Sequence, residues 1–435
     1  MPTDAQASAV TDDVRADDLD VPHDPDGAPI PDGAVVVATS DTTTTRTGRV
    51  HFPALDGLRA VGAYMVILTH AGFRSGQSLD GTLFAAVLSR FNYGVTLFFV
   101  LSGFLLYRPF AAHGLGEGKR VAIGGYFRRR AARIIPALWM FLLVVLTFVV
   151  QQGATARDYY SYLLLIQVYN HNDGHPELTH LWSLSAEVLF YFLLPVIGWL
   201  FARPTGDRNR SYRRQLVGIA VLLVLSYGFD ILRGSHVISH GQAALWLPNF
   251  LPWFLIGMLL AVVSLGDRSI TVARRARRTL SRWASSLATC WFIAVILFAM
   301  STLPIGTPYD LKVPDAAQFI TQNTLFGLSA FFVLLPLVAG SHPKADKALG
   351  TGIGKFLGEI SYSVYLWHVP CMVLVERWLG LEIFSGQFWT ILALTALLST
   401  AIASLSWKLL EQPALRYLSG RRTARARKHT TSNAQ

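Results

Sequence analysis

Arg59 and His70 are the side chains best suited to chemistry in the apolar segment LDGLRAVGAYMVILTH, residues 55–70. On a helix, their separation of eleven positions corresponds to about 16 Å along the axis and to nearly a whole number of turns. Both side chains are therefore expected on one side of the helix, with Asp56 beside Arg59. Histidine acts as a general base or nucleophile near neutral pH, although a single histidine in a membrane helix often only hydrogen-bonds a neighbouring helix. The pairing with Arg59 favours a catalytic interpretation.

A second cluster of charge closes the segment RRRAARIIP, residues 128–136. Arg130 and Arg133 are about one helical turn apart, and such a pair can hold a phosphate or pyrophosphate group. The competing interpretation is contact with lipid head groups at the cytoplasmic membrane surface. Glu411, in the late segment LLEQP, is expected to be an ion-pair partner for one of these arginines.

The segment HLWSLSAEVLFY, residues 180–191, carries three polar groups at helical spacing. Ser183 and Glu187 are four positions apart, and His180 and Glu187 are seven apart, which predicts one shared helix face. Such a face can orient an acceptor hydroxyl or tune His70. The preceding loop contains His171 and further histidines, but it lacks the spacing of a helical zinc motif, so no metal site is predicted.

Two further segments place small or polar residues among apolar ones. In FFVLSGFLL, residues 98–106, Ser102 and Gly103 allow close approach of either a slender ligand chain or another helix. In GEISYSVYLWH, residues 358–368, Tyr362 and His368 enter a late apolar stretch. His368 is expected to form a hydrogen bond within the bundle rather than to act in catalysis.

The composition indicates a membrane protein. Only 15% of the 435 residues are charged, against roughly 25% in soluble domains, and 52% are hydrophobic. Stretches of about 20 apolar residues suit a membrane-spanning helix. The predicted fold is an all-α, polytopic bundle of about ten transmembrane helices. The predicted spans are 54–73, 93–112, 133–151, 181–201, 215–233, 243–265, 285–303, 318–340, 357–379 and 388–410.

The charge distribution predicts the orientation. Residues 1–50 have ten Asp and three Arg, a net charge of −7, so the remainder carries +18 of the total of +11. Alternate connections and the C-terminal tail hold 26 Lys and Arg, whereas the opposite connections hold six. Because Lys and Arg favour cytoplasmic loops, both termini are predicted to be cytoplasmic. No aromatic-interleaved basic groove suggests a nucleic-acid partner.

Three domains are predicted. Residues 1–50 form a disordered acidic cytoplasmic tail, 51–418 the transmembrane domain, and 419–435 a basic cytoplasmic tail. The two cysteines, Cys290 and Cys371, lie in apolar runs and are expected to be buried without a disulfide or a metal.

The motifs, taken in order, resemble those of the acyltransferase family 3 integral membrane proteins. LDGLRAVGAYMVILTH resembles the family's Arg-x10-His first span, FFVLSGFLL its second-span motif and RRRAARIIPALW its Arg-x-x-Arg-Ile-x-Pro connection. HLWSLSAEVLFYFLLP, SYSVYLWHVP and LLEQP also fit, and the resemblance covers about residues 51–418. Two positions depart from many members. Val188 replaces a second acidic residue, and Gln412 replaces an arginine.

The resemblance implies an O-acyltransferase of the cell membrane, with acyl-CoA, most simply acetyl-CoA, as donor and no other cofactor. The acceptor would be a hydroxyl of an envelope glycan, a glycolipid or a macrolide. It implies His70 as base or acyl carrier, with Glu187 as the second catalytic group on the acceptor side. The implied donor residues are Arg59, Arg130, Arg133, Ser102 and Gly103. The implied supporting residues are Asp56, His180, Trp182, Ser183, Tyr191, Tyr362, His368 and Glu411.

A transporter or flippase of an envelope lipid or drug is the alternative function. It would use the same intramembrane charges as a pathway. Transporters often contain inverted repeats with broken helices in corresponding halves. The sequence has no such symmetry, and the Arg59–His70 pair occurs in one half only. An enzyme is therefore favoured.

Overall fold

The regular secondary structure of the described chain consists of helices. The computed structural model describes residues 51–150, 153–170, 174–235, 237–238, 242–265, 269–272, 274–305 and 315–417, all within one compact unit that spans residues 39–435. Both predicted tails, 1–50 and 419–435, lie outside these residues. Within them every regular element is an α-, 3-10 or π-helix and there is no strand, which confirms the all-α fold class.

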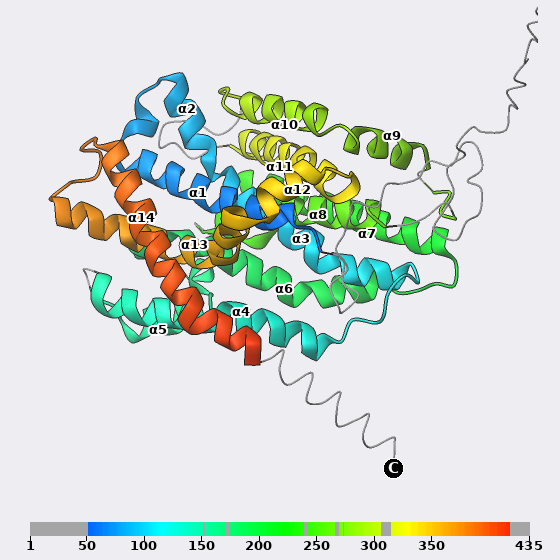
Figure 1. The fold of residues 1–435 in the computed structure, drawn as a ribbon, viewed down its shortest axis with the longest axis horizontal. Coiled ribbons are helices and arrows are strands. Elements are labelled where there is room, and N and C mark those ends of the chain that lie inside the picture. The colour runs from blue at the N-terminus through cyan, green and yellow to red at the C-terminus, as the bar shows by residue number, and fades with distance from the viewer. Residues whose placement is uncertain are drawn as a thin grey trace, which may run out of the picture. The chain divides into compact units, whose positions relative to one another are not determined.

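The long helices lie alongside one another (Figure 1). They are α1 (Ala54–Arg74), α3 (Tyr93–Gly114), α4 (Ile123–Val144), α6 (Trp182–Phe201), α7 (Arg208–Gly234), α8 (Leu247–Val263), α10 (Leu287–Ser301), α11 (Ala316–Ala339), α13 (Gly352–Leu379) and α14 (Phe388–Ser406). Shorter helices are α2 (Leu83–Ser89), α5 (Ala156–Leu163), α9 (Arg274–Ala284) and α12 (Pro343–Gly350). The 3-10 turns are η1 (Gln77–Leu79), η2 (Arg90–Asn92), η4 (Gln167–Tyr169), η5 (Pro176–Leu181) and η6 (Ala243–Leu245), and the π-turns are η3 (Val145–Val149) and η7 (Trp407–Glu411).

Seven helical segments of the described chain are long and apolar enough to cross a membrane, and an eighth is added if the bent pair α9 and α10 counts as one span. The chain is thus an integral membrane protein. A helix stands at each of the ten predicted places, but α1 and α13 are not among those seven. These two helices carry polar residues that include Arg59, His70 and Glu376. The number of ten spans therefore stays a prediction.

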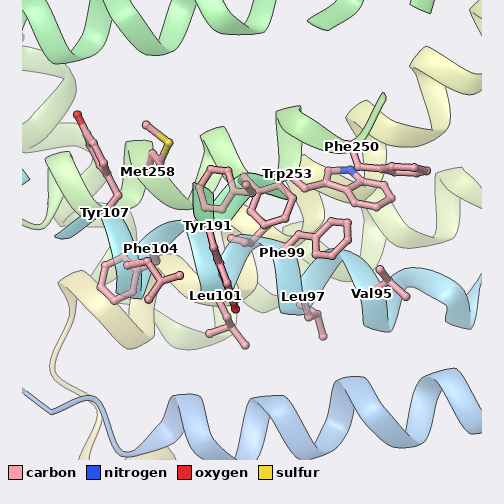
Figure 2. Packing of buried hydrophobic residues seen from close by; sticks show 14 of the residues in the cluster. Val95, Leu97, Phe99, Leu101, Phe104, Tyr107, Tyr191, Phe250, Trp253 and Met258 are labelled. Atoms are coloured by element: carbon pink, nitrogen blue, oxygen red, sulfur yellow. The ribbon is translucent and has the colours of Figure 1, made fainter. Parts of the chain in front are cut away.

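Helix α3 lies at the centre of the core, between α1 and α8. In Figure 2 the side chain of Phe99 on α3 lies against Phe250 and Trp253 of α8. The Phe99 ring stacks on Phe254 at 4.4 Å between centroids, and Phe254 stacks on Phe190 of α6 at 4.1 Å. Offset stacking of this kind adds about 0.5–1.5 kcal/mol per pair beyond burial. The stack therefore fixes α6 against α3, which matters because both helices contribute to the site.

Two glycines set the distance between α3 and α8. A Cβ atom at Gly103 would lie 2.1 Å from the backbone oxygen of Phe254, and one at Gly257 would lie 2.1 Å from the backbone oxygen of Val100. No side chain fits at such a distance. Gly103 is therefore a packing residue here, as one of the two interpretations of the sequence expects. Cys290 and Cys371 are free and buried.

Helices α1 and α13 are joined near both ends. At the start of α1, a Cβ atom at Gly358 would lie 2.0 Å from the backbone oxygen of Asp56, so the two backbones touch. At the end of α1, Arg74 Nε donates to both carboxylate oxygens of Glu376, at 2.7 and 2.9 Å. The two polar helices thus run together inside the bundle.

Replacing Gly103 by alanine should destabilise the protein by about 1–3 kcal/mol, because the added methyl group forces α3 and α8 apart. Gly228→Ala is the control, since Gly228 is also helical and nothing lies within 4 Å of its Cβ position. Thermal unfolding in detergent gives the unfolding midpoint of each purified variant. Equal midpoints for the two variants would contradict the packing role of Gly103.

Candidate active site

Polar residues from five helices line one cavity of about 290 Å³, called here the basic cavity. On α3 its lining extends from Val95 to Leu106, which is about 16 Å along the helix axis. The polar and tyrosyl side chains of its lining are His51, Asp56, Arg59, Ser102, Arg130, Arg133, Ser183, Glu187, Tyr191, Ser361, Tyr362 and Tyr365. The cavity thus brings together most of the side chains that the sequence singles out.

Three arginines make the basic cavity positively charged. Arg59 Nη1 donates to Asp56 Oδ1 at 3.1 Å. The Arg130 guanidinium lies 5.9 Å from the centre of the Tyr191 ring. Within the described residues neither Arg130 nor Arg133 has a salt bridge, so two half-buried positive charges remain available to a ligand. Guanidinium groups bind phosphate oxygens with paired hydrogen bonds, so the arrangement suits a phosphorylated anion.

Glu187 belongs to the same cavity. Its Oε1 accepts hydrogen bonds from Ser102 Oγ at 2.5 Å and from Tyr191 OH at 2.6 Å. The sequence associates Glu187 with His70 and the acceptor, whereas its hydrogen bonds here are to Ser102 and Tyr191. Tyr362 also lines the cavity, and its hydroxyl donates to the backbone oxygen of Ile134 at 3.2 Å.

His70 lies outside the cavity lining, in a cluster of three histidines. Its ring centre is 5.1 Å from that of His368, which in turn is 5.0 Å from that of His180. His180 Nε2 bonds the backbone oxygen of Leu366 at 2.9 Å, and His368 Nδ1 bonds that of Tyr365 at 2.6 Å. Carbonyl oxygens only accept, so these nitrogens carry the protons. The other nitrogens, His180 Nδ1 and His368 Nε2, are buried and have no hydrogen-bond partner among the described residues.

Tyr365 connects the basic cavity with the histidine cluster. It lines the cavity, while its ring lies 5.6 Å from that of His180 and 5.5 Å from that of His368. Its hydroxyl donates to the backbone oxygen of His180 at 2.9 Å and lies 2.5 Å from Ser183 Oγ. The same side chain thus forms the wall of the cavity on one side and touches the histidines on the other.

Two ion pairs hold the elements that carry the histidines. Arg74 and Glu376 join α1 to α13, and Arg377 Nη2 donates to Glu177 Oε1 of η5 at 3.2 Å. Both carboxylates are buried. A charge-assisted bond with little exposure to water resists separation more than a surface pair does. His70, His180 and His368 therefore keep their relative positions.

His180 lies on the 3-10 turn η5, which runs directly into α6 at Trp182, and both His180 and Ser183 contact Tyr365. One expectation needs correction. Glu411 forms no salt bridge with Arg130 or Arg133 in the described chain. Its carboxylate accepts a hydrogen bond from Ser363, and Arg133 acts on it only electrostatically.

Two other predicted residues have different surroundings. Trp182 packs on Phe250 with 4.5 Å between ring centres and lies outside the basic cavity. Gly103 also lies outside the lining, at the contact of α3 with α8. His171 is not among the described residues, and in those residues no three His, Cys, Asp or Glu side chains have a metal-binding arrangement.

Comparison with known proteins agrees with the resemblance found in the sequence. A family model described as "Acyltransferase domain" matches residues 52–408. The chain is 25% identical over 385 residues to "O-acetyltransferase OatA" of Staphylococcus aureus, covering 83% of this chain and 57% of that protein. It is also 25% identical over 389 residues to "Peptidoglycan O-acetyltransferase OatA" of Listeria monocytogenes, covering 85% and 57%. The chain thus spans little more than half the length of these relatives, and no solved structure matches.

Glu376→Gln should destabilise the protein by about 3–5 kcal/mol, because it leaves the Arg74 charge without a carboxylate inside the bundle. Glu382→Gln is the control, since Glu382 is exposed beyond the end of α13. Thermal unfolding in detergent gives the comparison. If both variants unfold like the unchanged protein, the ion pair does not hold α1 to α13.

Proposed function

The chain belongs to the acyltransferase family matched over residues 52–408, and from this premise we propose that it is a membrane O-acetyltransferase acting on a cell-envelope glycan. One observation carries the proposal. Tyr365 lines a cavity with three arginines, and the same side chain contacts His180 and His368, the second of which lies beside His70. An anionic donor could therefore bind in the basic cavity, and a proton-accepting histidine lies on the other side of Tyr365.

Acyl-CoA is the proposed donor. Arg59, Arg130 and Arg133 would bind its phosphates at the end of the cavity that the charge distribution predicts to be cytoplasmic. The pantetheine arm would then lie along α3, where the lining includes Phe98 and Leu105. The length of about 16 Å along α3 brings the thioester to the Tyr365 wall. Asp56 and Glu187 orient the cavity's polar groups and offset part of its positive charge.

His70 is the proposed base. It takes the proton of the acceptor hydroxyl, the hydroxyl oxygen attacks the thioester carbonyl, and the carbon–sulfur bond breaks to release the CoA thiolate, which recovers the proton. In a second form of the mechanism, His70 takes the acyl group first and passes it to the acceptor. Because Tyr365 lies between the cavity and His368, which is beside His70, both forms would require the Tyr365 side chain to turn away from Ser183.

The acceptor is proposed from the relatives. Their printed names describe O-acetyltransferases, one of them specific for peptidoglycan, so peptidoglycan or a similar envelope glycan is the first acceptor to assay. A transporter would move its substrate unchanged. Release of labelled acetate or transfer of label from acetyl-CoA by the purified protein separates these two functions.

His70→Ala should lower acetyl transfer by about 10²–10⁴-fold, the contribution typical of a positioned general base. The assay follows labelled acetyl-CoA with purified protein in liposomes and an envelope-glycan acceptor. His113→Ala is the control, since His113 lies near the end of α3 and outside the basic cavity. Transfer by His70→Ala at the rate of the control would eliminate His70 as base and as acyl carrier.

Arg130→Gln and Arg133→Gln should each raise the KM for acetyl-CoA about tenfold or more, because each removes a charge-assisted hydrogen bond to a phosphate. Arg128→Gln is the matched control. Arg128 is on the same helix, is exposed and does not line the cavity. A uniform effect of all three substitutions would indicate orientation in the membrane rather than donor binding.

A further inference from the structure

A second cavity, of about 310 Å³, has no lining residue in common with the basic cavity and is called here the polar cavity. It is built from α5, η4, η5, α6 and η6, which are connecting elements and the first turn of α6. The charge distribution predicts that the connections containing η4, η5 and η6 lie on the non-cytoplasmic side. The mechanism proposed above uses none of its polar groups.

The polar cavity is rich in hydroxyl and amide groups. They belong to Ser161, Tyr162, Gln167, Asn170, Thr179 and Gln242. Its charges are one arginine, Arg157, and one carboxylate, Asp158. Burial raises the pKa of Asp158, but hydrogen bonds from Thr155 and the nearby His175 imidazole outweigh it and bring that pKa below its ordinary value. The carboxylate is thus ionised and balances Arg157, so the lining favours a neutral ligand with many hydroxyl groups.

Several of these groups are already held in place. Asn170 Nδ2 donates to Ser161 Oγ at 2.8 Å, and Gln167 Nε2 donates to Ser185 Oγ at 2.8 Å and to the backbone oxygen of Leu181 at 3.2 Å. Both N–H groups of the Gln167 amide are thereby used, whereas the Asn170 amide has a second N–H besides the one bonded to Ser161. Gln167 Oε1 is buried and has no hydrogen-bond partner among the described residues, which leaves an acceptor for a ligand hydroxyl. Leaving such an atom unsatisfied costs about 1–3 kcal/mol.

An aromatic partition separates the two cavities. Trp182 lines the polar cavity, Phe99 lines the basic cavity, and their ring centres are 6.3 Å apart in an edge-to-face contact. Trp182 and Ser183 are consecutive, yet each faces a different cavity. The same η5 turn contributes Thr179 to the polar cavity and His180 to the histidine cluster. The Trp182 and Phe99 side chains therefore separate a ligand in the polar cavity from the basic cavity, and the η5 turn joins the polar cavity to the histidine cluster.

We propose that the polar cavity binds a neutral saccharide ring of the acceptor, with Trp182 against the ring and the amides of Gln167 and Asn170 bonding its hydroxyls. The indole supplies a flat apolar surface with a polar edge, which suits the C–H face of a sugar. Convergent polar groups around an aromatic wall are typical of a small-molecule site. The inference rests on the proposed function, because it assigns the acceptor of that reaction to this cavity.

The inference is tested by placing a large side chain at the exposed edge of the polar cavity. Thr179 is exposed and lines the cavity, so Thr179→Trp blocks the space without altering the core. Asn170→Leu, which removes an amide at nearly constant size, is the second variant. Leu164→Trp is the control, because Leu164 is exposed directly after α5 and does not line the cavity. Size-exclusion chromatography of the full chain in detergent establishes that each variant is folded.

Two readouts are needed. Saturation-transfer NMR with the N-acetylglucosamine–N-acetylmuramic acid disaccharide reports saccharide binding, and hydrolysis of labelled acetyl-CoA without acceptor reports the donor reaction. For Thr179→Trp we expect loss of the disaccharide signals and at least a tenfold increase in the acceptor KM, with unchanged acetyl-CoA hydrolysis. Asn170→Leu should raise the acceptor KM severalfold, and Leu164→Trp should behave like the unchanged protein.

The outcomes separate this inference from the proposed function. The saccharide site is overturned if the unchanged protein does not bind the disaccharide, or if Thr179→Trp does not weaken that binding. This holds even if the protein hydrolyses acetyl-CoA. Binding that depends on Thr179 in a protein that neither hydrolyses acetyl-CoA nor transfers acetyl groups supports the site and overturns the proposed function.

Discussion

A charged side chain at the centre of a membrane costs about 2.5–3.5 kcal/mol unless it meets a partner or a polar cavity, and α1 and α13 carry several such groups. This cost explains why the two helices run together inside the bundle. Asp56 pairs with Arg59 at one end of α1, and Arg74 pairs with Glu376 at the other. The first pair lines the basic cavity, and His70 of the histidine cluster lies one turn before Arg74 of the second pair. The ion pairs that stabilise α1 in the membrane therefore also position the site.

The site has two compartments because its polar groups come from opposite halves of the helices. Arg59, Arg130 and Arg133 lie toward the start of α1 and α4, whereas His70 lies one turn before the end of α1. Tyr365 lines the cavity that holds the arginines and also contacts His180 and His368 of the histidine cluster. A donor with charge at one end and a reactive group at the other fits this division. The charges of Arg59, Arg130 and Arg133 are thereby kept away from the histidine that must accept a proton, while the nearby Arg74 is paired with Glu376.

The sequence predicts the parts of the site that depend on long helices. A single continuous α1 places Arg59 and His70 at the expected axial separation, and the convergence of Arg59, Arg130, Arg133, Ser102 and Glu187 follows from spans that pack together. The family resemblance is confirmed by the match over residues 52–408. The expected ion pair of Glu411 with Arg130 or Arg133 was wrong because the Glu411 carboxylate accepts a hydrogen bond from Ser363 instead. The polar cavity lies on connecting turns without a periodic pattern, so no sequence signal marks it.

The decisive experiment is a structure of the protein with a non-hydrolysable acetyl-CoA analogue. We expect phosphate oxygens bonded to Arg130 and Arg133, with the pantetheine arm along α3 and the carbonyl of the analogue at the position of the Tyr365 side chain, on the side of the histidine cluster. An analogue bound at another surface, or one in the basic cavity whose carbonyl points away from the histidine cluster, would contradict this expectation.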